Sequence, residues 1–518
     1  MSFRLIVPRH GHHDGARAPA QIFQSQRDCV LQPRVARHEL PWVSVPTRPS
    51  TLKGLCLRFN PFNFACTLAA LLLVTPTPSR AANTLNWNTN QNHVTADIKG
   101  SELLPVLEQI ASETGWHIFV EQDTIHNRVS AKFDDVKVGE ALHLLLGDVN
   151  YALVPQNTGS SKLFVFRTSQ ANATFLVRAS KPGETNSAPK VIPNELIVRL
   201  KPGAKIEDIA RLLGAKVVGR IDSLNAYRLQ FEDAAATEAA RKSLAANSYV
   251  ASVDSNYSVD RPTTPRQVPP GSTIPGAPQL QMKPPADSGR VIVGLVDTAV
   301  QSLGSSLDEF VLKQLSVAGD SQLDPTSPSH GTSMAETILT ALQAVTKGST
   351  SVQILPVDVY GPNSSSSTFD VANGIVTAVN NGAKIVNLSL GTDTDSSFLR
   401  SVIQDASGKN ILLIAAAGNT PVTTAFYPAA YPGVLAVTAV DNNKQVASYA
   451  NRGDFVTLGT PGTSVIYYNG QAYYVSGTST SSANASGLAA GYMDARGGTT
   501  SQAQTFLLSN FSFSASGK

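Results

Sequence analysis

The chain is organised around the stretch SGTSTSSANASG, residues 476–487. It follows the aromatic run 473–475 and leads into LAAGYM, residues 488–493, a pattern that predicts a strand, a tight glycine turn and a buried helix. Ser479 would then lie at the N-terminus of that helix. Unpaired backbone N–H groups and the positive end of the helix dipole gather there, which suits a nucleophile beside a developing oxyanion. Taken alone, however, a serine in this position is more often a helix cap.

The sequence before this stretch alternates strand and helix patterns, which is typical of a parallel α/β sheet. Near-continuous apolar runs predict strands that are covered on both faces, at residues 291–296, 352–357, 383–388, 411–416 and 434–440. Helical patterns fall between them, near residues 331–344, 369–380 and 396–407. We therefore expect a doubly wound, mostly parallel sheet, in which ligands bind at the carboxyl ends of the strands.

Two further residues could complete a hydrolytic site with Ser479. Asp297 ends the first apolar strand, and His330 lies in SHGTSMA, residues 329–335, at a predicted helix start. His330 is the only histidine after His143, so it is the only imidazole in this part of the chain that could act as a general base. A serine hydroxyl needs such a base, and the imidazolium that forms needs a buried carboxylate to orient and stabilise it. The order Asp, His, Ser is also that of subtilisin.

Six segments resemble the successive signature blocks of subtilisin-like (S8-type) serine endopeptidases. They are VIVGLVDT, SHGTSMA, KIVNLSLG, LIAAAGN, YPAAYPGVLAVTAVD and VSGTSTSSANASG, in the family's order, and the resemblance extends over residues 286–518. It implies a serine endopeptidase with Asp297, His330 and Ser479 as its catalytic triad. It also implies that Asn419 is an oxyanion donor and that Ser389, Leu390 and Gly391 form the strand that pairs with the substrate backbone. Ala417 and Gly418 would form a wall of the S1 pocket.

The sequence departs from the family pattern near all three triad positions. The family usually has glycine two residues after the aspartate, a second histidine after His-Gly-Thr followed by a glycine, and Met-Ala-x-Pro after the nucleophile. The corresponding residues here are Ala299, Ser333, Glu336, Thr480, Ser481 and Ala483. None of these differences removes a proton-transfer group, so they bear on packing and rate.

A small α+β unit at residues 188–260 resembles the inhibitory propeptide of subtilisin-like proteases. The resemblance lies in PNELIVRLKPGA, LGAKVVGRIDSLNAYRLQF and SYVASVDSNYSVD, and in the position of the unit directly before the protease-like part. A proline-rich linker follows at residues 261–285, where proteolytic processing is expected. The resemblance implies a zymogen whose propeptide assists folding and blocks the cleft.

Residues 84–167 alternate strand and helix patterns and resemble the short N-terminal domain of secretins and TonB-dependent transducers. The resemblance lies in ELLPVLEQIASETGWHIFVEQ and VSAKFDDVKVGEALHLLLGDVNYALV, and it implies an envelope protein as partner. We expect a polar linker at about residues 169–189. The histidines of this part have no metal-ligand spacing, which favours surface or packing roles. They are His93, His117, His126 and His143.

Residues 1–82 form a basic N-terminal extension with a net charge of +7, so the rest of the chain carries −4. Within the extension, an apolar run at residues 62–74 is followed by small residues, which predicts export with a signal peptide cut near Ala82. A non-Met start codon near residues 52–57 would place this signal at the N-terminus. The alternative is an uncleaved membrane anchor behind a cytoplasmic basic arm. Export predicts a periplasmic or secreted protein.

Composition narrows the remaining function classes. A mildly acidic body argues against nucleic acid and anionic membranes as partners. All three cysteines lie before residue 67, which leaves the later domains without disulfides or thiolate metal ligands. We expect that no cofactor is required; a structural calcium ion has no clear signature, because Asp320, Asp393 and Asp395 look like ordinary loop acids. Two hypotheses remain: an exported serine endopeptidase made as a zymogen, and a catalytically weak or inactive subtilisin-like scaffold that acts as a binding or sensing protein of the envelope.

Overall fold

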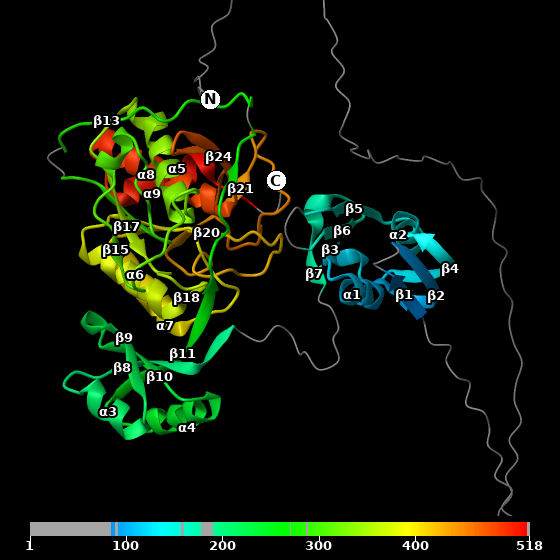
Figure 1. Ribbon diagram of the computed structural model, residues 1–518, viewed down its shortest axis with the longest axis horizontal. Helices are drawn as coiled ribbons and strands as arrows, with labels where there is room; N and C mark the ends of the chain where they lie inside the picture. Colours follow the sequence, from blue (N-terminus) through cyan, green and yellow to red (C-terminus); the bar gives the residue numbers. More distant parts are fainter. Residues whose placement is uncertain are drawn as a thin grey trace, which may run out of the picture. The chain divides into compact units, whose positions relative to one another are not determined.

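The computed structural model describes residues 84–88, 92–156, 160–177, 190–269, 271–285 and 289–514. The predicted extension, apolar run and signal peptide of residues 1–82 lie outside these ranges, as do residues 178–189 of the expected polar linker. Within the described ranges, no helix has the length and apolar character needed to cross a membrane. Three folded parts follow one another along the chain (Figure 1).

The first part contains two small sheets and two helices. Strands β1, β2 and β4 form one sheet, and β5, β6, β3 and β7 form the other in that order. Buried faces of α1 and α2 join both sheets in one apolar cluster. The elements are β1 (Thr84–Asn88), β2 (His93–Glu102), α1 (Leu103–Thr114), β3 (His117–Glu121), β4 (Arg128–Lys137), α2 (Val138–Leu146), β5 (Asn150–Val154), β6 (Lys162–Phe166) and β7 (Ala173–Val177).

The expected polar linker at about residues 169–189 is wrong in its first part. Residues 173–177 form β7, which pairs antiparallel with β3. The segment is apolar at its ends, where Ala173 and Val177 are buried. Pairing also supplies backbone hydrogen-bond partners that a linker would have to find in water.

The second part is a five-stranded sheet backed by two helices. Its strand order is β18-β11-β8-β10-β9, with β18 supplied by the protease-like part. The cluster under the helices is built from alternating apolar residues such as Leu196, Val198 and Leu229. The elements are β8 (Val191–Leu200), α3 (Ile206–Leu213), β9 (Lys216–Ile221), β10 (Ala226–Gln230), α4 (Ala234–Ala245) and β11 (Val250–Asp260).

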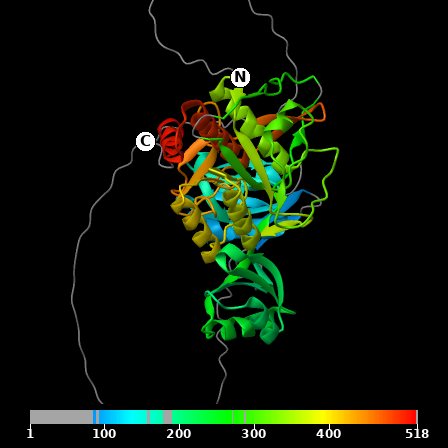
Figure 2. The same ribbon diagram turned by 90° about the vertical axis from the view of Figure 1, so that its left-hand side faces the viewer.

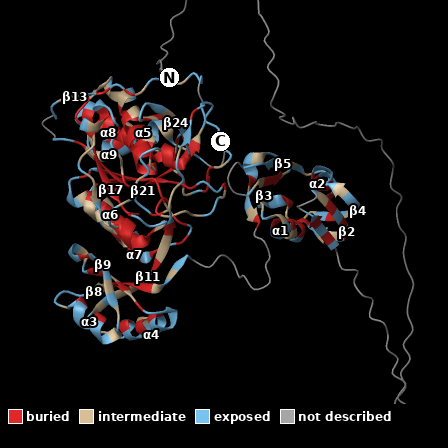
Figure 3. Cartoon of the chain, viewed as in Figure 1, coloured by how far each residue is buried: buried red, intermediate tan, exposed pale blue. Residues whose placement is uncertain are grey.

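The third part is built on a seven-stranded sheet in the order β15-β17-β14-β19-β20-β21-β22, in which all neighbouring strands are parallel. The strands are β15 (Leu315–Ser316), β17 (Gln353–Asp358), β14 (Ile292–Asp297), β19 (Ile385–Leu388), β20 (Leu412–Ala416), β21 (Val434–Val440) and β22 (Leu458–Pro461). The strands expected from the five apolar runs are all present. Their apolar character follows from burial on both faces, which Figure 3 shows for the central strands.

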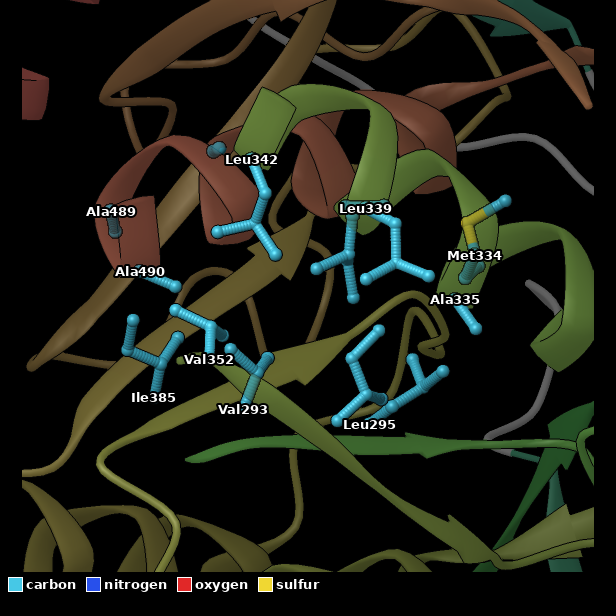
Figure 4. Close-up of a cluster of buried hydrophobic side chains, with 14 of the residues drawn as sticks. Val293, Leu295, Met334, Ala335, Leu339, Leu342, Val352, Ile385, Ala489 and Ala490 are labelled. Carbon is cyan, nitrogen blue, oxygen red and sulfur yellow. The ribbon is translucent and has the colours of Figure 1, made fainter. Parts of the chain in front are cut away.

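Helices cover both faces of this sheet, as Figures 1 and 2 show. One face packs against α5 (His330–Thr346) and α8 (Thr478–Arg496), with α9 (Thr500–Phe511) beside α8. Figure 4 shows this layer, with Leu339 and Leu342 of α5 facing Val293 and Leu295 of β14. The other face packs against α6 (Thr368–Asn380) and α7 (Ser397–Gly408). The doubly wound parallel sheet expected from the sequence is therefore confirmed.

Short strands complete the third part. A hairpin of β23 (Thr463–Tyr468) and β24 (Gln471–Ser476) leads directly into α8. β12 (Arg266–Gln267) pairs antiparallel with β24, and β13 (Gln281–Met282) pairs parallel with β16 (Ser349–Thr350). β18 (Ser365–Ser367) precedes α6. The proline-rich linker is therefore held against the protease-like part at two places.

Two glycines allow the site helices to approach their neighbours. A Cβ on Gly331, the second residue of α5, would lie 2.1 Å from the carbonyl oxygen of Thr298. A Cβ on Gly487 of α8 would lie 2.4 Å from the carbonyl oxygen of Ile338. Backbone atoms cannot give way as a side chain can, so only glycine fits at either position.

Candidate active site

Asp297 and His330 form a buried pair at the carboxyl end of the sheet. His330 Nδ1 lies 2.8 Å from Asp297 Oδ1 and 3.0 Å from Oδ2. The aspartate is fully buried and its Oδ1 also accepts from the Thr298 backbone N–H at 2.7 Å. Because the carboxylate accepts from Nδ1, Nε2 remains the basic nitrogen of a neutral imidazole.

The start of α5 places His330 beside this carboxylate. Ser329 caps the helix, and its hydroxyl accepts from the Thr332 N–H at 3.0 Å. The Gly331 N–H donates to Thr298 Oγ1 at 2.8 Å, which joins the helix start to the end of β14. His330 is only 5% exposed, so the pair is shielded from most competing water.

Ser479 is the second residue of α8 and is 9% exposed. Its hydroxyl donates to the Ser389 carbonyl oxygen at 3.0 Å, and among the described residues no hydrogen bond joins it to His330. A rotation about the Cα–Cβ bond would release the hydroxyl from this carbonyl. Catalytic hydrogen bonds are often loose before substrate binds, so this geometry is compatible with a nucleophile.

Buried hydroxyls attach the start of α8 to the end of β19. Ser389 Oγ donates to the Ser479 carbonyl oxygen at 3.1 Å and lies 2.9 Å from Ser482 Oγ. Farther along α8, Ser486 Oγ donates to Asn387 Oδ1 at 3.0 Å. The serine-rich composition of α8 is therefore explained by polar contacts within the core, each of which satisfies a group that burial would otherwise leave unpaired.

Asn419 follows β20 and lies against the same helix start. Its Oδ1 accepts from the Thr478 N–H at 2.8 Å and from Thr478 Oγ1 at 3.1 Å. With the oxygen held in this way, the amide Nδ2 is the end left to donate. A Cβ on Gly477 would lie 3.2 Å from Nδ2 and 3.7 Å from the Ser479 backbone nitrogen, so both donors border the same small region.

The two expected substrate-binding walls border the same cleft as His330 and Ser479. Ser389, Leu390 and Gly391 line it on one side, and Gly418 lines it beside Asn419. Ala417 is fully buried behind that wall. The sequence prediction thus names residues that lie together in space.

The N-terminal end of the linker also lines this cleft. β11 pairs antiparallel with β18 through residues 258–260, and residues 260–267 line the cleft with His330 and Ser479. Arg261 donates to the carbonyl oxygens of Gly361 at 2.7 Å and Asn363 at 3.0 Å, and Tyr360 OH donates to the Asp260 carbonyl oxygen at 3.0 Å. The chain is therefore held on both sides of the cleft, by β18 before it and by β24 after it.

Two parts of the chain match models of known protein families. A model of the subtilase family matches residues 288–512, and a model of the fervidolysin N-terminal prodomain matches residues 178–256. Over 319 residues the chain is 31% identical to a thermophilic serine proteinase from Bacillus sp. (strain AK1), an alignment covering 58% of this chain and 77% of that protein. This chain belongs to the subtilase family. It is a serine-type endopeptidase with a prodomain.

Two further matches cover different shares of this subtilase. Subtilisin Savinase from Lederbergia lenta is 32% identical over 221 residues, covering 40% of this chain and 81% of that protein. The crystal structure of fervidolysin from Fervidobacterium pennivorans, described as a keratinolytic enzyme related to subtilisin, aligns at 20% identity and a TM-score of 0.47. That alignment covers 60% of this chain and 56% of the fervidolysin chain.

The prodomain of this subtilase contacts the N-terminus of α6 through buried polar groups. Asn256 Oδ1 accepts from the Phe369 N–H and from Thr368 Oγ1, both at 3.1 Å, and Asn256 Nδ2 donates to Glu195 at 2.7 Å. Arg228 donates to Asp370 Oδ2 at 2.8 Å. Burial raises the pKa of Asp370, although Arg228 and Ser367 favour its charged form. Sequence reasoning missed this contact, because the partners are more than a hundred residues apart.

The departures from the family pattern are accommodated in different ways. Ser333 Oγ donates to the Ser329 carbonyl oxygen at 2.8 Å, and Ser481 Oγ donates to that of Thr460 at 3.1 Å. Ala299 and Ala483 are buried in the core. Thr480 and Glu336 each keep one buried oxygen without a partner. Most of these side chains are therefore accommodated by burial or by hydrogen bonds. The carboxyl of Glu336 is the exception, because ionising it in the core is electrostatically unfavourable.

Glu336 is 1% exposed on α5, and only its Oε1 has a partner, the Tyr467 N–H at 2.8 Å. Burial raises its pKa from near 4.5 to about 7, partly opposed by that hydrogen bond. The folded state therefore binds a proton more tightly than the unfolded state, so stability falls as pH rises from about 4.5 to about 7 and stays lower above that. A shift of this size corresponds to about 3 kcal/mol.

Glu336→Gln should therefore stabilise the protein increasingly across this pH range, because glutamine keeps the acceptor for Tyr467 and cannot ionise. We expect little difference at pH 4 and a gain of about 3 kcal/mol at pH 8, measured by urea unfolding of Ser479→Ala backgrounds to prevent proteolysis. Exposed Glu238 supplies the control, since Glu238→Gln should show no comparable pH-dependent gain. A constant difference between Glu336→Gln and its parent at all pH values would contradict the assignment.

The three loop acids weighed as calcium ligands do not come together. Asp395 pairs with Arg400, and Asp393 Oδ1 accepts from Thr394 Oγ1 at 3.2 Å. In the part of the chain that the structure describes, no three His, Cys, Asp or Glu side chains gather as a candidate metal site.

Proposed function

We propose that this subtilase cleaves peptide bonds through Asp297, His330 and Ser479 and is made as a self-inhibited zymogen. The observation that carries the proposal is the buried His330–Asp297 pair, whose histidine lines the same cleft as a serine at a helix N-terminus. In the first step, Nε2 of His330 accepts the hydroxyl proton as Ser479 Oγ attacks the carbonyl carbon. Asp297 stabilises the imidazolium, which then donates the proton to the leaving amine. Water hydrolyses the acyl-enzyme by the same route in reverse.

The negative charge of the tetrahedral intermediate needs fixed donors. Asn419 Nδ2 and the Ser479 backbone N–H are the groups we assign to it, supported by the way Thr478 holds the other end of the amide. The α8 dipole adds positive potential at the same point. Every role is filled by a protein group, so we propose that catalysis requires no cofactor.

Substrate backbone would lie along Ser389, Leu390 and Gly391, with the side chain before the scissile bond directed between this wall and Gly418. Recognition by backbone hydrogen bonds tolerates many sequences, which suits a general endopeptidase. The substrates are therefore extended segments of proteins or peptides.

Self-inhibition is supported by the path of residues 258–267. They pair antiparallel with β18 through residues 258–260 and continue along the cleft to β24. Hydrogen bonds hold Arg261 and the Asp260 carbonyl oxygen where the segment leaves β18. A substrate cannot enter the part of the cleft that residues 260–267 line until this segment leaves.

We further propose that the enzyme is exported and that residues 84–167 bind an envelope protein. One relative, from Bacillus subtilis, carries the name minor extracellular protease Epr and is 38% identical over 135 residues. Four of the exposed large apolar residues lie in the first domain, where they offer surface for a partner. They are Leu144, Leu153, Val154 and Phe175.

The experiment that tests the peptidase and zymogen proposals follows the purified chain from residue 83 onward. We expect it to release a mature fragment that begins after residue 260, identified by mass spectrometry, and to react with a fluorophosphonate at Ser479. Ser479→Ala should stay full length and unlabelled, and Ser476→Ala, at the end of β24, should behave like the parent in labelling. A folded parent that neither self-cleaves nor labels would instead support the inactive scaffold.

A further inference from the structure

One aromatic side chain lies between the two walls of the cleft. A Cβ on Gly391 would lie 2.4 Å from Cε1 and 3.0 Å from Cδ1 of Phe426. A Cβ on Gly418 would lie 3.2 Å from Cγ of the same ring. The ring therefore contacts both glycines and extends from one wall to the other.

Phe426 is half-buried and lines the cleft. It belongs to none of the apolar clusters formed by the described core residues, whereas three other phenylalanines of this domain are cluster members and three more pack against a cluster. Its ring is thus placed in the cleft by its backbone and not by core packing. The position of this partly exposed ring between two substrate walls points to a role in substrate binding.

The backbone around Phe426 is firmly held. Thr392 and Tyr427 exchange two backbone hydrogen bonds, each 2.8 Å long, which join the loop to the wall that ends in Gly391. The Phe426 carbonyl oxygen accepts from the Ala430 N–H at 2.8 Å. The ring can therefore leave only by rotating its own side chain into solvent, which would expose apolar surface.

A substrate side chain next to the scissile bond would need the space that the ring fills. The substrate carbonyl carbon must reach Ser479, which lines the same cleft as the wall residues Gly391 and Gly418. Protein interiors are close-packed, so a second large side chain cannot share the volume of a phenyl ring. Only hydrogen or a small group fits.

We propose that Phe426 closes the bottom of the pocket for the P1 residue and restricts cleavage to bonds after glycine, alanine or serine. This inference rests on the proposed function, since it names the substrate class of the same site. Phe426 is a specificity residue: it touches the substrate side chain and takes no part in proton transfer.

The test compares self-processed parent and Phe426→Ala on peptide p-nitroanilides that differ only at P1, alanine against phenylalanine. We expect the parent to prefer alanine by about 100-fold or more in kcat/KM, and the variant to shift that ratio by about 100-fold towards phenylalanine. Phe513→Ala, at a half-buried phenylalanine outside the cleft lining, is the matched control and should keep the parental ratio.

Fluorophosphonate labelling distinguishes failure of the proposed function from failure of the P1 assignment alone. If the parent is not labelled and hydrolyses neither peptide, the proposed function fails. If it is labelled yet cleaves the phenylalanine peptide as well as the alanine peptide, the ring moves aside and this inference alone is overturned. A labelled Phe426→Ala variant with an unchanged P1 ratio would overturn it as well.

Discussion

His330→Ala should lower kcat by about 10⁶-fold, a magnitude taken from subtilisin itself. Without the imidazole, Ser479 loses the general base assigned to it, and Asp297 is left as a buried carboxylate with one partner fewer. Ser479→Ala should cause a loss of similar size. The double variant should lose little more than either single variant, because the two residues act on one proton.

The measurement is steady-state hydrolysis of a chromogenic peptide by protein whose prodomain has been removed by an added protease, since neither variant should process itself. Circular dichroism shows whether His330→Ala remains folded. His126→Ala is the matched control, because His126 is exposed in the first domain and contacts Glu102 at 3.4 Å. Losses that simply add in the double variant would show that His330 and Ser479 do not work on the same step.

Asn419→Ala should lower kcat by about 10²- to 10³-fold with a small change in KM, again a magnitude taken from subtilisin. The amide would stabilise charge that exists only in the transition state, so its loss should leave substrate binding nearly intact. Asn419→Asp should be at least as damaging, since a carboxylate cannot donate and would repel the oxyanion.

Thr478 offers a finer test of the same donor. Its hydroxyl accepts from the Gly418 N–H and donates to Asn419 Oδ1, both at 3.1 Å, so it is a positioning residue. Thr478→Val should reduce kcat by roughly 10-fold, which is about one hydrogen bond, and Thr478→Ser should restore it. Equal activity of the valine and serine variants would mean that the backbone N–H of Thr478 holds the amide without help from the hydroxyl.

Strands and helices of the protease domain followed closely from apolar patterning. Runs such as residues 434–440 are apolar because helices cover both faces of the sheet, and this cause is visible in the sequence itself. The same patterning misjudged residues 173–177, since a five-residue strand at a sheet edge differs little in composition from a linker. Pairing with β3, far away in the chain, decided its structure.

The candidate site also combines residues that the sequence identifies with residues that only the fold brings together. Residue chemistry and chain order were sufficient to name Asp297, His330 and Ser479 as candidates, and the resemblance to subtilisin-like proteases added Asn419. Thr478 was within reach as well, because it neighbours the serine, but its contact with Asn419 joins residues 59 positions apart. Phe426 had no signal in its own surroundings, and only the fold brings it against Gly391 and Gly418.

By itself, then, the sequence determined the parallel α/β class, the small residues around Ser479 and the identity of the groups able to move a proton. Each of these depends on local composition or on the chemistry of a side chain. Tertiary structure alone decided the state of Glu336, the path of residues 258–267 along the cleft and the ring between its walls. Burial and contact depend on which distant segments the fold brings together, and spacing along the chain does not record that.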